Sequence, residues 1–193
     1  ESEGAAKATE PMFGGRRTHH KEVNFDPDGP ADAAVETTVS SLDLANGSSG
    51  GVALTESDDL SIESMQQNAA APMTLTLTDG ELTVTDGADD PDVYSADVLT
   101  IIEGNGDGIG IGQETVAAGI TLSNTELSRM SASNGLTLQS AGGISVDAVT
   151  EAASDALNTV ALNSTAATVT FTGNYTAAAS SNVFDGLDVT AAG

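Results

Sequence analysis

Short alternating strands recur along this chain at a nearly constant interval, and this repetition is the feature that most limits its fold. Seven such segments begin at Val52, Met73, Asp97, Gly119, Gly142, Ala167 and Phe184. Their starts are separated by 21, 24, 22, 23, 25 and 17 residues. A period in this range is typical of solenoids, in which each unit buries its apolar face by stacking on the next.

The periodicity within the segments favours strands over helices. Helical repeats need apolar residues at i, i+3, i+4 and i+7, whereas apolar residues here alternate with small polar ones. Residues 124–132, "NTELSRMSA", form the one stretch that fits a helical turn, with Ser123 or Asn124 as its cap and Glu126 near its start. The frame of a leucine-rich repeat is absent, which leaves a parallel β-helix or an antiparallel sandwich or barrel.

The pair Asp79-Gly80 bears on this choice, because Asp-Gly between two alternating runs is a strong hairpin signal. The same pair can also turn a corner between two faces of one coil. Similar pairs do not recur at hairpin spacing, so we favour the corner. We therefore predict an all-β chain in which residues 36–193 form a parallel, right-handed β-helix solenoid of roughly six or seven coils, stacked about 4.8 Å apart. Residues 1–35 lack strand periodicity and are predicted to be an irregular arm, linker or cap.

Composition agrees with a narrow core built from thin layers. The 193 residues include no Trp, two Tyr and four Phe, so Val, Leu, Ile and Ala must fill the interior. No cysteine is present, which excludes disulfides and cysteine-based metal sites. No apolar run approaches the roughly 20 residues that a transmembrane helix needs, so we expect no membrane insertion.

The charge is strongly acidic and unevenly distributed. The chain has 29 acids, five bases and a net charge of −24. Four of the bases lie in the first 21 residues, so residues 22–193 carry 26 acids and a single base, Arg129. Such a surface repels nucleic acids and anionic membranes. It indicates either solubility in a saline medium or specific binding of divalent cations.

The segment "GDGIGIGQETVAAGITLSNTELSRMSASNGLTLQSAGGISVDAV" resembles the coils of filamentous-haemagglutinin-like proteins and other giant secreted β-helix adhesins. The matching parts are a Gly-Ile-Gly turn, a strand, a Glu-Leu segment and two further strands, at Gly108–Gly112, Ile120–Leu122, Glu126–Met130, Leu136–Leu138 and Gly143–Val146. The likeness spans about residues 50–190, and the family's amino-terminal secretion motif is absent. It implies an extracellular β-helix that is an internal or processed segment, or a distant relative.

Two acidic loops are candidate calcium sites. Glu103, Asn105 and Asp107 place oxygen atoms at alternate positions between glycines, which suits a hard cation. The other candidate set is Asp89, Asp90 and Asp92. The alternative interpretation of the first loop is a coil corner in which glycine supplies a positive φ.

Nothing in the sequence indicates catalysis. Residues 21–193 contain no histidine that could activate a serine nucleophile. Neighbouring acids such as Asp58 and Asp59 could supply the carboxylate pair of a glycosidase, but acids in a loop are far more often a solvated surface. We therefore predict no catalytic residue and a protein that is not an enzyme.

The expected function is structural: an extracellular or cell-surface β-helix that belongs to a filament, surface layer or adhesin stalk. Open solenoid ends carry unpaired strand groups, and head-to-tail contacts that do not close build filaments. The residues expected to take part in this assembly are Arg16, Arg17, Lys21, Phe184, Leu187 and Val189. The alternatives are a glycan- or receptor-binding adhesin module and, third, a carbohydrate-active enzyme.

Overall fold

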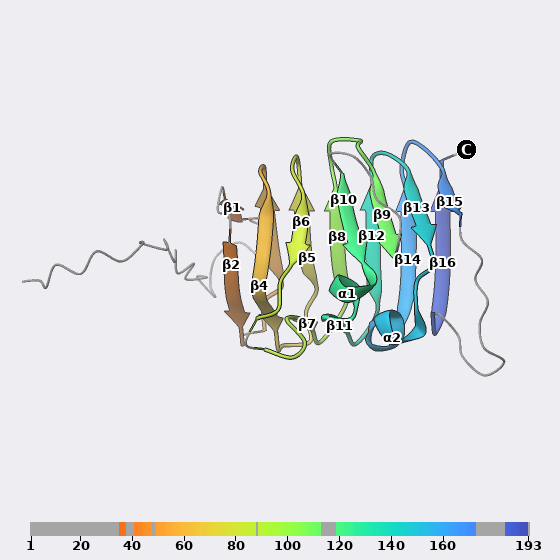
Figure 1. The fold of residues 1–193 in the computed structure, drawn as a ribbon. Coiled ribbons are helices and arrows are strands. Elements are labelled where there is room, and N and C mark those ends of the chain that lie inside the picture. Colours follow the sequence, from red (N-terminus) through yellow and green to blue (C-terminus); the bar gives the residue numbers. More distant parts are fainter. Residues whose placement is uncertain are drawn as a thin grey trace, which may run out of the picture.

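The fold, seen in a computed structural model, consists of parallel strands in three sheets (Figure 1). The structure describes residues 35–37, 41–47, 49–87, 89–112, 119–172 and 184–192. Every strand pairing within this part of the chain is parallel, so the prediction of an all-β fold with parallel sheets is confirmed.

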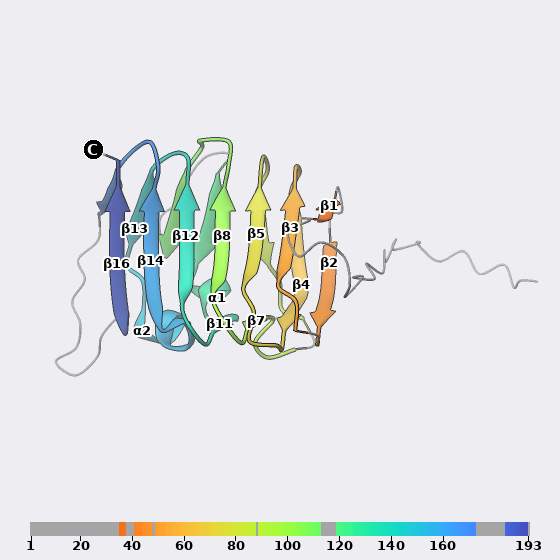
Figure 2. The same ribbon diagram turned by 180° about the vertical axis from the view of Figure 1, so that it is seen from behind.

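Sheet A is the longest of the three and faces the viewer in Figure 2. Its strands follow one another in sequence order, but a strand of another sheet always lies between them in the chain. They are β1 (Val35–Thr37), β3 (Val52–Glu56), β5 (Met73–Leu77), β8 (Leu99–Glu103), β12 (Leu136–Ser140), β14 (Thr159–Ser164) and β16 (Gly186–Ala191).

The other two sheets lie behind sheet A in that view. Sheet B has the order β11-β7-β4-β2, with β6 paired to β4. Its strands are β2 (Ser41–Asn46), β4 (Leu60–Gln67), β6 (Leu82–Val84), β7 (Val93–Ser95) and β11 (Met130–Ala132). Sheet C has the order β10-β9-β13-β15 and comprises β9 (Ile109–Gly112), β10 (Ile120–Ser123), β13 (Ile144–Asp147) and β15 (Val169–Phe171).

The core is a stack of in-register apolar rows between the sheets. In sheet A, for example, Leu75 pairs with Ile101 and Ile101 with Leu138, and these three side chains are 0%, 2% and 0% exposed. Val, Leu, Ile and Met supply most of the large buried side chains, as the composition requires. Each layer therefore depends on the layers on either side of it for burial.

Two short helices lie below the strands of sheet C in Figure 1. Helix α1 (Asn124–Leu127) begins after Ser123, whose hydroxyl accepts from the N–H of Glu126 while the Glu126 carboxylate accepts from the Ser123 N–H. The predicted helical turn and its Ser123 cap are thus confirmed, but the turn ends at Leu127, and the last three residues of the predicted stretch 124–132 form strand β11 instead. Helix α2 (Glu151–Ser154) is followed by the 3₁₀ turn η1 (Asp155–Leu157). No helix among the described residues has the length and apolar character to cross a membrane.

The Asp79-Gly80 pair turns a corner, as the sequence favoured. It connects β5 in sheet A to β6 in sheet B, and Gly80 has φ +80°. A hairpin would have paired these two strands side by side. The two runs belong to different sheets instead.

One pair of segments departs from the predicted repeat. The segment that begins at Asp97 contains β8 and β9, and the segment that begins at Gly119 contains β10. The next strand of sheet A is β12, which pairs with β8 37 residues earlier. Ile109 of β9 pairs with Ile120 of β10, so two consecutive parallel strands stack within one passage between sheet A strands. The segment start at residue 119 therefore does not mark a new strand of sheet A.

Candidate functional site

The carboxyl-terminal end of the strand stack is the first candidate site. Strand β16 is the last strand of sheet A and pairs with β14 along one edge. Among the described residues no strand pairs with its other edge. The exposed large apolar side chains lie at this same end: Phe171 on β15 is 42% exposed, Leu187 on β16 is 46% exposed and Val189 is 44% exposed.

Leu187 and Val189 occupy core positions of the sheet. In register they pair with Val160 and Leu162 of β14, which are only 2% and 1% exposed. All four positions carry Leu or Val. The two on β14 are buried because β16 lies beside that strand, whereas no described strand lies beyond β16. The described structure therefore ends in a layer whose core-type side chains remain open to solvent.

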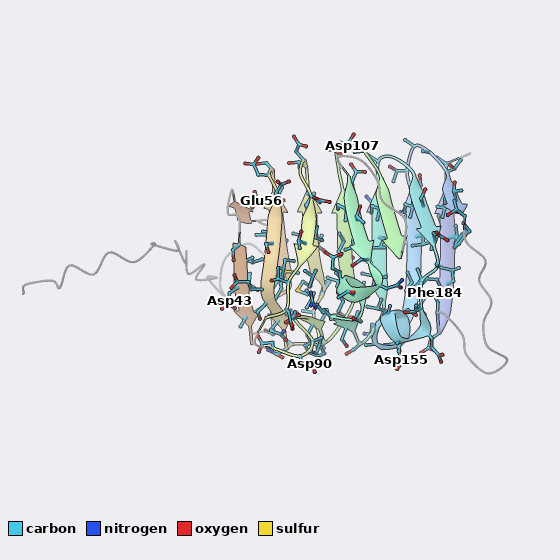
Figure 3. The ribbon with its side chains drawn as sticks, viewed as in Figure 1. Asp43, Glu56, Asp90, Asp107, Asp155 and Phe184 are labelled. Carbon is cyan, nitrogen blue, oxygen red and sulfur yellow. The ribbon has the colours of Figure 1, made fainter. Side chains whose placement is uncertain are left out.

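Phe184 behaves differently from its two neighbours. It is partly buried and packs against the core (Figure 3). Three of the predicted assembly residues, Phe184, Leu187 and Val189, thus lie in or beside the last strand of sheet A. The other three, Arg16, Arg17 and Lys21, lie outside the described residues.

The opposite end of the stack differs in the sheet B side chains that the structure describes. Strand β2 is the terminal strand of sheet B, yet its inward side chains Leu42 and Leu44 are only 5% and 6% exposed. Among the side chains that the structure describes, the large exposed apolar ones thus lie at the end formed by β15 and β16.

The first predicted calcium loop is built around a buried carboxylate. Glu103 is the last residue of β8 and is 3% exposed. Its Oε1 accepts from the N–H groups of Gly106 at 2.6 Å and Asp107 at 3.1 Å. Its Oε2 accepts from Ser140 Oγ at 2.6 Å and from the N–H of Gly142 at 3.4 Å. Burial alone would raise the pKa of Glu103, but these hydrogen bonds outweigh it and hold the pKa below its ordinary value.

The other two residues of this loop bond to each other. Asn105 Nδ2 donates to Asp107 Oδ2 at 2.7 Å, and the Asp107 N–H donates to Asn105 Oδ1 at 3.0 Å. Both loop residues are exposed, whereas Glu103 points inward and binds the turn backbone. The loop is a corner, and Gly106 and Gly108 have positive φ values there.

The three acids of the second predicted calcium loop also differ in burial and in hydrogen-bond partners. Asp89 Oδ2 accepts from Ser64 Oγ at 2.6 Å, and Asp90 is exposed. Asp92 is 3% exposed, and its Oδ1 accepts from the Gly87 N–H at 3.0 Å. Asp89 and Asp92 therefore bind different groups, and Asp90 faces solvent.

Arg129 is the partner that the sequence did not assign. Its Nε lies 3.8 Å from Asp92 Oδ2, and its Nη2 lies 3.9 Å from Oδ2 of the exposed Asp86. Its Nη1 donates to the carbonyl oxygen of Val84 at 2.9 Å. The guanidinium group thus connects the turn after α1 to the loop between β6 and β7. No local sequence pattern predicts this pairing, because Asp92 and Arg129 lie far apart in the sequence.

The two predicted cation loops do not combine into one site. Asp107 and Asp90 lie at opposite ends of the strands (Figure 3). In the part of the chain that the structure describes, no group of three His, Cys, Asp or Glu residues is arranged to hold a metal ion. Calcium binding by either loop stays a prediction.

Comparison with known proteins adds no relative: no protein-family model, no curated protein and no solved structure matches this chain. The resemblance to filamentous-haemagglutinin-like proteins therefore stays a prediction that rests on the quoted segments alone.

Proposed function

We propose that this chain is a structural protein whose parallel sheets form a right-handed β-helix solenoid that assembles end to end through its terminal layers. The chain path supports the solenoid, because it returns to sheet A after each passage through sheets B or C and adds the new strand beside the previous one. Crossovers between parallel strands are right-handed in about 98% of cases, which supports the handedness.

One observation carries the assembly proposal: side chains at core positions are open to solvent in the last layer. Fully burying a Leu or Val side chain stabilises by about 1.5–3 kcal/mol. Leu187 and Val189 are a little less than half exposed, so covering them would contribute about 1 kcal/mol each. The open edge of β16 also offers backbone donors and acceptors to another strand.

The partner at this end would be a further layer of similar strands, from the next subunit or from a longer polypeptide. An end that presents a different surface from its opposite makes a head-to-tail contact, and repeated head-to-tail contacts that do not close form filaments. The arm of residues 1–35, with Arg16, Arg17 and Lys21, would act as a clasp on the acidic body of a neighbour. The setting we propose is extracellular, in a filament, a surface layer or an adhesin stalk.

Analytical ultracentrifugation of the 193-residue chain tests this proposal. We expect the sedimentation coefficient to rise with protein concentration, and electron microscopy to show rods longer than one molecule. The double variant Leu187→Asp and Val189→Asp should stop this growth, because it places charge on the open layer. Thr190→Asp on the same strand is the matched control, since Thr190 pairs with the outward-facing Asn163.

A variant without residues 1–35 tests the clasp separately and should assemble more weakly. A stable monomer over a wide concentration range, for both the full chain and this deletion variant, would overturn the assembly proposal. Growth that the double variant leaves unchanged would also overturn the assignment of the contact to β16.

A further inference from the structure

We propose that the outer face of sheet A, from β3 to β14, binds an extended neutral polysaccharide. This inference goes beyond end-to-end assembly and concerns the side of the stack rather than its end. The face consists of the outward residues of five neighbouring strands, which lie in the front layer of Figure 2.

The outward residues form two in-register rows across these strands. One row is Ala53, Thr74, Thr100, Thr137 and Ala161. The other is Thr55, Thr76, Ile102, Gln139 and Asn163. All ten side chains are half-buried, because each is flanked by its neighbours in the row.

The face carries no charged side chain, although the chain as a whole has a net charge of −24. The acids lie at the turns instead: exposed Asp58, Asp79 and Asp107 follow β3, β5 and β8. On the strand beyond this face, Asp188 of β16 continues the first row. A neutral strip is thus bordered by negative charge.

This charge pattern selects the chemistry of the partner. A polyanion would be repelled by the bordering acids and would meet no cation on the face. A metal ion would find hydroxyl and amide groups without carboxylates, a poor ligand set for a hard cation. A neutral ligand rich in hydroxyl groups meets neither obstacle.

The side chains of the two rows suit such a ligand. Thr hydroxyls donate and accept hydrogen bonds, and Gln and Asn amides do both through separate atoms. Asn163 Nδ2 donates to Gln139 Oε1 at 3.5 Å, so these two amide side chains are hydrogen-bonded along the row, from one strand to the next. Because neighbouring strands lie 4.7–4.9 Å apart, the hydroxyls of Thr74, Thr100 and Thr137 recur at about that interval, and the hydroxyls of a chain of similar sugar units also recur regularly.

The size of the face argues against a second copy of the protein as the occupant. Five strands about 4.8 Å apart, each about 17 Å long, cover about 400 Å². A stable protein interface buries about 800 Å² on each partner. This face also has no open strand edge, and a second copy would bring its own rim of acids against the first.

Affinity electrophoresis in native gels that contain a soluble polysaccharide tests the proposal. The probes are dextran, galactomannan, laminarin and hydroxyethyl cellulose as neutral polymers, with alginate as the charged comparison. We expect at least one neutral polymer to slow migration and alginate to have no such effect. Thr137→Asp, in the middle of the face, should raise the dissociation constant at least tenfold.

Ser145→Asp is the matched control, since Ser145 faces outward on β13 of sheet C and the substitution adds the same charge. It should bind as the unmodified chain does. The double variant Thr100→Val and Thr137→Val removes two hydroxyls and keeps the side-chain shape, and it should also weaken binding. The Leu187→Asp, Val189→Asp variant should still bind, which separates this proposal from the assembly proposal.

Three results would overturn the inference. The first is migration that no neutral polymer slows while circular dichroism shows a folded chain. The second is equal binding by the Thr137→Asp and Ser145→Asp variants, or full binding by the double valine variant. The third is a concentration-dependent dimer that Thr137→Asp alone abolishes, which would assign the face to contacts between copies.

Discussion

Replacing Glu103 by Gln should destabilise the fold much more than its small change in shape suggests. The carboxylate accepts from Ser140 Oγ and from the N–H groups of Gly106, Asp107 and Gly142. An amide at this position keeps one acceptor oxygen and turns a donor toward groups that also donate. Whichever way the amide turns, either the Gly106 N–H or the Ser140 hydroxyl then loses its carboxylate acceptor, at a cost of about 1–3 kcal/mol, and the charge assistance of the remaining bonds is lost as well. We expect a total loss of about 2–4 kcal/mol in the free energy of unfolding.

Glu103 should also make the stability of the fold depend on pH. The pKa of Glu103 is lower in the folded chain than its ordinary value of 4.5. Its contribution to stability is therefore fully present above pH 4.5 and is lost as the pH falls through the lower, folded-state pKa. The stability gap between the unmodified chain and Glu103→Gln should shrink over this acidic window. Comparing the two proteins also cancels most of the pH dependence that the other acids contribute.

Urea denaturation followed by circular dichroism, at neutral pH and at several acidic pH values, measures this gap. Glu81→Gln is the control, because Glu81 is exposed in the turn before β6 and the substitution is identical. It should change the unfolding free energy by less than about 0.5 kcal/mol. The reasoning fails if Glu103→Gln is as stable as Glu81→Gln at neutral pH. It also fails if the stability lost in Glu103→Gln stays the same as the pH is lowered through the acidic range.

Two further predictions concern the core and the charge. Val146→Asp should destabilise by about 4 kcal/mol or more, because Val146 is fully buried, whereas Ser145→Asp on its outward neighbour should cost far less; denaturant midpoints measure both. The melting temperature of residues 22–193, with their 26 acids, should rise in molar salt as repulsion is screened. Sodium and calcium chloride at equal ionic strength distinguish screening from binding, since equal melting temperatures would exclude a specific calcium site.

The local structure of the corners could be predicted from short sequence signals. The Ser123 and Glu126 pair gave the helical cap, and Asp79-Gly80 gave the corner between sheets A and B. Both signals work because the hydrogen bonds or backbone angles they need lie within a few residues. Interactions of this range do not depend on how the layers stack.

The position of β9 and β10 could not be predicted in the same way. Each has the alternation of a strand, but alternation does not say which strand lies beside it. Gly112 ends β9 with φ +81°, and a Cβ atom there would collide with the Asp147 carbonyl oxygen, so glycine allows β9 and β13 to approach each other at this point. That contact joins residues far apart in sequence, which a local pattern does not report.

The role of Glu103 was missed although its signal was present. In β8 the inward positions are Leu99, Ile101 and Glu103, so strict alternation places the carboxylate inside the corner. The alternating oxygen-bearing residues of the loop indicated a cation ligand at Glu103 instead. The inward–outward alternation of the strand would have predicted a buried acceptor for the N–H groups of the turn.

The same inward–outward alternation bears on the open end. In β14 the alternation places Val160, Leu162 and Ser164 inward, and all three are buried. Strand β16 repeats this pattern in register with Leu187 and Val189, but both are exposed. A strand at a solvent-facing end gains nothing from large apolar residues at its inward positions, and natural edges are commonly protected by charge or proline. Strand β16 has the side chains of an interior strand, and this is the physical reason to expect another layer beyond it.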